Sequence, residues 1–134
     1  MMKLMLNGDA KNKHVERQGI YILGKNFVNN HPYWGQQNGS YALWFVNGVR
    51  YWILGGKIDL GQNYGWIAGP SGIDRSPTQI VNGWRYAAYG RWLDAYASEI
   101  MFKDLTTGIK FSKLVIHYET INFHIFQLLM ILVK

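Results

Sequence analysis

The chain has 134 residues, of which 49% are hydrophobic and 16% are charged, and its formal net charge is +6. This length and composition predict one globular domain and exclude an intrinsically disordered protein. The absence of cysteine excludes a disulfide-stapled scaffold, a Cys-ligated zinc site and thiol catalysis. Apart from Lys11, Lys13 and Arg17, which share one predicted loop, the basic residues are scattered, so their charge favours a solvated surface over a nucleic-acid footprint.

Short apolar runs alternate with Gly, Asn and Pro about every ten residues, a pattern typical of small all-β domains. We predict about eight short antiparallel strands in a curled sheet or a sandwich-like barrel. The first and last strands should lie near each other, as the ends of domains often do. In chain order, the expected strands are 3–6, 19–23, 32–34, 41–46, 49–54, 64–68, 84–88, 91–93 and 99–103.

Asn47-Gly48 separates the two most apolar of these strands and favours a hairpin with a two-residue type I′ turn. The facing pairs would then be Val46 with Val49, Trp44 with Tyr51, and Leu43 with Trp52. Both faces of this hairpin are apolar, which predicts a central position covered on both sides. Tyr89-Gly90 is expected to form a second turn, and the Pro- and Gly-containing segment 69–77 a loop.

The composition changes near Thr106, because all six tryptophans, all three prolines and all but one of the 15 glycines precede it. We therefore expect an aromatic-rich β domain over 1–105 and a hydrophobic, basic tail over 106–134. Apolar residues from Phe111 to Leu132 follow helical spacing, which predicts an amphipathic helix that docks on a sheet or makes peripheral contact with a membrane. The apolar run 128–133 is too short to span a bilayer. The competing interpretation is a read-through artefact, translated from AT-rich noncoding DNA.

Several short motifs lie at intervals along residues 3–105. They are Leu4-Met5-Leu6-Asn7-Gly8, Gly19-Ile20-Tyr21, Asn29-Asn30-His31-Pro32-Tyr33-Trp34, Trp52-Ile53-Leu54-Gly55 and Leu60-Gly61, followed by Pro77, Trp84, Gly90, Trp92 and Asp94. This series resembles an aromatic-rich β repeat module of multi-domain invertebrate and protist proteins. The resemblance implies an all-β fold and a chain that is one module of a larger protein; its motifs are structural.

Six tryptophans and eight tyrosines before residue 106 exceed what one small core can bury, so some are expected at the surface, where exposed aromatic clusters mark binding sites. Trp44, Trp52, Trp84 and Trp92 fall in two predicted hairpins and are assigned to the fold. Trp34 and Trp66 lie nearer to turns and polar loops. The candidate ligand-binding residues are Tyr33, Trp34, Gln36, Asn38, Tyr64 and Trp66.

Aromatic rings flanked by amides predict a non-enzymatic module that binds glycans or extended peptides. The alternatives are an architectural spacer of a larger protein and, less favoured, a single-stranded nucleic-acid binder. Neither the acidic residues nor the four widely spaced histidines form a catalytic or metal-binding motif, so we expect no catalytic residue, metal or cofactor. With no signal peptide or transmembrane segment expected, the predicted location is cytoplasmic, unless the chain is a fragment of a secreted parent.

Overall fold

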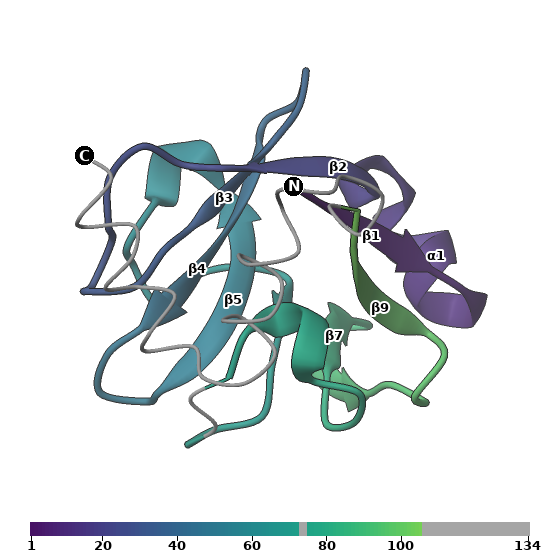
Figure 1. Ribbon diagram of the computed structural model, residues 1–134. Helices are drawn as coiled ribbons and strands as arrows, with labels where there is room; N and C mark the ends of the chain where they lie inside the picture. Colours follow the sequence, from purple (N-terminus) through teal and green to yellow (C-terminus); the bar gives the residue numbers. More distant parts are fainter. Residues whose placement is uncertain (73–74, 106–134) are drawn as a thin grey trace.

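The computed structural model describes residues 1–72 and 75–105, so the predicted helix in the tail lies outside the described residues. The described part is all-β, with nine antiparallel strands in one curled sheet (Figure 1). The strands follow the order β8-β7-β6-β5-β4-β3-β2-β1-β9. Their bounds are β1 Met2–Leu6, β2 Gly19–Leu23, β3 Trp34–Gln36, β4 Tyr41–Val46, β5 Tyr51–Gly56, β6 Ile67–Ala68, β7 Arg85–Ala88, β8 Arg91–Asp94 and β9 Ile100–Asp104.

The sheet curls far enough to bring its two ends together. Trp84 precedes β7 and Phe102 lies in β9, at opposite ends of the strand order, yet their ring centroids are 4.8 Å apart. The larger core cluster fills this concave side and takes buried residues from every strand except β8, whose Leu93 packs against it; its members include Leu4, Trp34 and Trp52. We call this side the inner face of the sheet and the opposite side the outer face.

The central hairpin of β4 and β5 is buried on both faces, as the sequence predicts. Leu43, Phe45, Trp52 and Leu54 belong to the inner cluster. Ala42, Trp44, Val46 and Ile53 form a second, smaller cluster on the outer face. Packed side chains therefore cover both faces of the hairpin.

The predicted register of this hairpin is wrong. A four-residue loop, 47–50, connects the strands, so that Val46 pairs with Tyr51 and Trp44 with Ile53. Within the loop, Gly48 and Arg50 have positive φ. The shift is by two residues, and because side chains alternate with a period of two, each residue keeps its predicted face.

Most other strands lie where the sequence places them. β1 and β9 pair along their whole length, which confirms that the first and last strands are neighbours. Tyr89 and Gly90 both have positive φ and connect β7 to β8 by the predicted two-residue turn. β3 begins two residues later than expected, and β6 is shorter.

The sequence did not predict helix α1 (Gly8–His14), which continues into the 3₁₀ turn η1 (Val15–Arg17). Its first turn has no side-chain cap from Asn7. Instead, the Ala10 N–H donates to Glu99 Oε2 at 3.3 Å, and the Asn7 N–H donates to the Glu99 carbonyl at 2.9 Å. A partner that is distant in sequence thus stabilises a helix that is too short to form by itself. Two further 3₁₀ turns are η2 (Lys57–Asp59) and η3 (Pro77–Gln79).

Candidate binding site: an aromatic trough on the outer face

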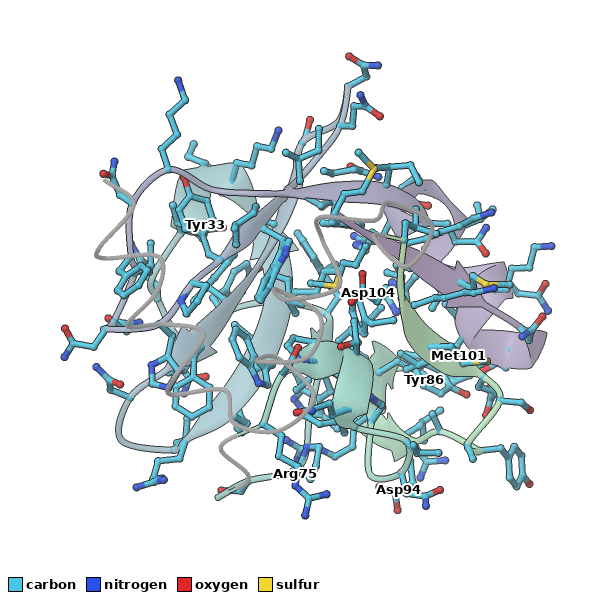
Figure 2. All side chains as sticks on the ribbon, viewed as in Figure 1. Tyr33, Arg75, Tyr86, Asp94, Met101 and Asp104 are labelled. Atoms are coloured by element: carbon cyan, nitrogen blue, oxygen red, sulfur yellow. The ribbon has the colours of Figure 1, made fainter. Side chains whose placement is uncertain are left out.

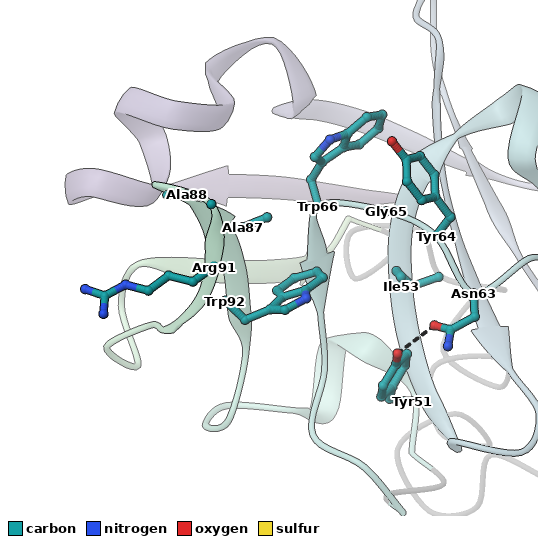
Figure 3. A pocket seen from close by; sticks show the side chains of 11 residues that line it. Tyr51, Ile53, Asn63, Tyr64, Gly65, Trp66, Ala87, Ala88, Arg91 and Trp92 are labelled. Atoms are coloured by element: carbon teal, nitrogen blue, oxygen red, sulfur yellow. Dashed lines mark hydrogen bonds between the residues drawn. The ribbon is translucent and has the colours of Figure 1, made fainter.

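A trough of about 600 Å³ crosses the outer face of β5, β7 and β8 and the segment that leads into β6 (Figure 3). Tyr64 and Trp66 stand on one side of it, and Tyr51 and Trp92 on the other. The floor is small and apolar and includes Ile53, Gly65 and Ala87. We call these residues the aromatic trough.

The trough exists because the chain before β6 lies directly on β5. A Cβ atom at Gly65 would approach the Leu54 carbonyl oxygen closer than any real contact and would lie 2.7 Å from Ile53 Cγ1. Only glycine permits this approach. The next residue, Trp66, then joins the sheet, since its N–H donates to Leu54 O and its carbonyl accepts from the Ala87 N–H, both at 2.8 Å.

The two rings of the first wall pack against each other, although Tyr64 is 56% exposed. Tyr64 and Trp66 have centroids 5.9 Å apart and an interplanar angle of 66°. Behind them, the buried Arg17 guanidinium lies 4.1 Å from the Trp66 centroid and 4.7 Å from that of Tyr41. An arginine stacked on two rings holds both by cation–π attraction.

Arg17 is itself held by hydrogen bonds from η1 and α1. It forms an ion pair with Glu16, and its Nη1 lies 2.9 Å from His14 Nδ1. His14 Nε2 lies 2.7 Å from the Ala87 carbonyl oxygen, which can only accept, so Nε2 carries the hydrogen and Nδ1 accepts from Arg17. Burial lowers the pKa of His14, and the nearby Arg17 charge acts in the same direction.

The second wall combines an oriented tyrosine with a half-exposed tryptophan. Tyr51 Oη donates to Asn63 Oδ1 at 2.6 Å, which places an amide at the rim of the trough (Figure 3). Trp92 is 42% exposed. The Arg85 guanidinium lies 5.5 Å from the ring centroids of both Tyr51 and Trp92, so an arginine lies against this wall as well.

Of the predicted ligand-binding residues, only Tyr64 and Trp66 line the trough. Tyr33 lines a separate hollow of about 320 Å³ on β2 and β3, and it lies far from Asp94 of β8 (Figure 2). Asn38 is exposed in the turn between β3 and β4. The structure therefore divides the predicted set among four places: the trough, this hollow, the turn and the inner side of β3, where Trp34 and Gln36 are buried.

The prediction that Trp34 is a ligand-binding residue at the surface is wrong. Its side chain is 4% exposed and packs in the inner core, with its ring 5.7 Å from that of Trp52. Gln36 is also buried, and its Nε2 donates to the carbonyls of Glu16 and Gln18 at 3.0 and 2.9 Å. Because residues 34–36 form β3, alternation turns both side chains inward.

Trp92 lines the trough, and the sequence interpretation missed it as a candidate because it assigned this residue to the fold. A signal was present: after the Tyr89-Gly90 turn, Arg91-Trp92-Leu93-Asp94 alternates, with Leu93 as the inward residue. That pattern places Trp92 on the same side of the strand as Asp94. The position of β8 at the edge of the sheet then leaves the ring half-exposed.

Within residues 1–72 and 75–105, no group of three or more His, Cys, Asp or Glu side chains is arranged to hold a metal ion. None of the helices in that part of the chain has the length and apolar character needed to cross a membrane. No protein-family model, curated protein or solved structure matches the chain.

Proposed function

We propose that the domain is a non-enzymatic module that binds a glycan in the aromatic trough. The observation that carries the proposal is the pair of aromatic walls facing each other across a small, apolar floor. The C–H face of a sugar ring can lie on an aromatic ring, and two such walls would hold consecutive rings of a chain. The volume of about 600 Å³ is in the range of small-ligand sites.

Polar groups at the rim suit the hydroxyls of a sugar. The Tyr51–Asn63 hydrogen bond fixes the amide, and a fixed amide loses little conformational entropy when it binds a hydroxyl. Among the described lining residues there is no Asp, Glu or His, whereas glycoside hydrolysis requires two carboxyl groups at the bond that is cleaved. This chemistry supports binding without cleavage.

A glycan array followed by calorimetric titration tests the proposal. Trp92→Ala should weaken binding by about 30-fold, the effect of losing a central aromatic contact worth ~2 kcal/mol. Tyr96→Ala is the matched control, because Tyr96 is 82% exposed and does not line the trough. Equal affinities for Trp92→Ala and the wild type, or an array without any bound glycan, would refute the proposal.

An extended peptide is the second candidate, favoured because β8 lies at one end of the strand order and pairs only with β7 among the described residues. The Ala95 N–H donates to the Trp84 carbonyl, and backbone groups alternate in direction along an antiparallel strand. The N–H and C=O groups of Trp92 and Asp94 therefore point away from β7, where a peptide strand could pair with them. A peptide array with Trp92→Ala and Tyr64→Ala distinguishes this candidate, since peptide binding at the edge depends less on Tyr64, which lies across the trough.

A further inference from the structure

We infer that the trough selects acidic glycans and that Arg85 is the residue that recognises their carboxylate. The inference rests on the proposed glycan function and specifies its ligand class as uronic-acid-containing saccharides. Both walls of the trough have an arginine beside a tryptophan. Trp66 is backed by Arg17, and Trp92 has Arg85 beside it, so each aromatic wall carries a guanidinium.

The two arginines differ in what neutralises them. Arg17 is buried and forms an ion pair with Glu16. Arg85 is only half-buried, and within the described part of the chain no carboxylate oxygen lies within 4.0 Å of its nitrogens. Even Asp94, its cross-strand neighbour in the register of β7 and β8, forms no such pair. The positive charge of Arg85 is therefore available to an external anion.

Arg85 does not itself line the trough, but it is held directly beside the second wall. Its guanidinium lies 5.5 Å from both Tyr51 and Trp92, the two rings of the second wall. Aromatic contacts on a planar guanidinium restrict its rotamers, and its fork of N–H groups matches a carboxylate bidentately. A sugar ring on Trp92 would carry its carboxylate toward this fork.

The same charges make the walls less suited to neutral sugars. A cation beside an aromatic ring interacts with the negative face of that ring. This interaction weakens the attraction between the ring and the C–H groups of a neutral pyranose. An acidic sugar gains direct attraction to the guanidinium instead. The trough thus discriminates by charge as well as by shape.

The test compares oligogalacturonate with a neutral galactose oligomer of the same length, by calorimetric titration at low salt. The wild type should bind the acidic oligomer at least about tenfold more tightly, as one charge-assisted hydrogen bond implies. Arg85→Gln should remove most of this preference and leave the neutral affinity within about twofold. Lys103→Gln is the control: it removes the same charge from an exposed residue of β9, at the other edge of the sheet.

The outcomes separate the inference from the proposed function. Equal losses in Arg85→Gln and Lys103→Gln would show attraction by net charge alone and overturn the role of Arg85. Binding of both oligomers with equal affinity would overturn the acidic preference while keeping glycan binding. Binding of neither would overturn both. Tighter binding of oligoglutamate than of oligogalacturonate, unaffected by Trp92→Ala, would assign the site to an acidic peptide and refute the inference.

Discussion

Adding one methyl group at Gly65 should destabilise the domain and disrupt the trough together. In Gly65→Ala the new Cβ meets the Leu54 carbonyl oxygen, Ile53 Cγ1 at 2.7 Å and Leu54 C at 2.9 Å. Two of these three atoms are backbone of a central strand and cannot rotate away. Overpacking costs about 1–3 kcal/mol, and a contact with fixed backbone places this variant near ~3 kcal/mol. At about 4 °C per kcal/mol for a domain of this size, the Tm should fall by roughly 12 °C.

Gly35→Ala is the matched control for this prediction. Gly35 also lies in a strand, β3, but a Cβ there would meet Lys57 Cε at 3.5 Å, which is an ordinary contact with a flexible side chain. Its Tm should stay within about 2 °C of the wild type or rise slightly, because alanine restricts the unfolded chain. Thermal unfolding followed by circular dichroism compares the two. If Gly65→Ala melts as Gly35→Ala does, the chain before β6 does not lie on β5 as described.

Three further predictions concern the aromatic residues and His14. Trp52→Ala should lower the free energy of unfolding by about 3–5 kcal/mol, because it removes a fully buried ring. Trp92→Ala should lower it by about 1 kcal/mol or less. Urea denaturation measures both losses, and similar values would contradict the placement of Trp52 in the core and Trp92 at the surface. Trp34→Phe should reduce the stability of the fold and leave the glycan affinity unchanged. Weaker binding in a calorimetric titration, with unchanged stability, would instead identify Trp34 as a ligand contact. Because burial lowers the pKa of His14 in the folded state, the unfolded chain takes up the proton first as the pH falls through 6.5. This contribution to stability is therefore present above pH 6.5 and is lost below it. His14→Gln, whose amide can still donate to Ala87 O and accept from Arg17, should show less loss of stability between pH 7 and 5. Identical pH profiles for the wild type and the variant would exclude this role for His14.

Local patterns in the sequence predict most of the strands. The nearly continuous apolar runs on both sides of Asn47-Gly48 predict a hairpin buried on both faces, and both core clusters confirm it. The register was missed because Asn47-Gly48 favours a two-residue turn, while the chain forms a four-residue loop with positive φ at Gly48 and Arg50. The turn type depends on how the whole hairpin packs against the rest of the sheet, and the residues of the turn alone do not determine this packing.

The candidate site was predicted in part. Tyr64 and Trp66 were identified because they stand beside polar and turn residues, and they line the trough. Trp34 was misplaced by the same reasoning: its neighbours are polar, but it is the inward residue of β3. Helix α1 was missed because its first turn is capped by Glu99, a residue about ninety positions away.

The sequence by itself determined the all-β class and the positions of most strands, because these follow from periodicity and turn residues, which act locally. Only the tertiary structure decided which aromatic rings face solvent. That outcome depends on where each strand lies in the sheet: β3 lies inside it and buries Trp34, whereas β8 lies at its edge and exposes Trp92. The curl of the sheet and the close approach at Gly65 then bring Tyr51, Tyr64, Trp66 and Trp92 around one trough.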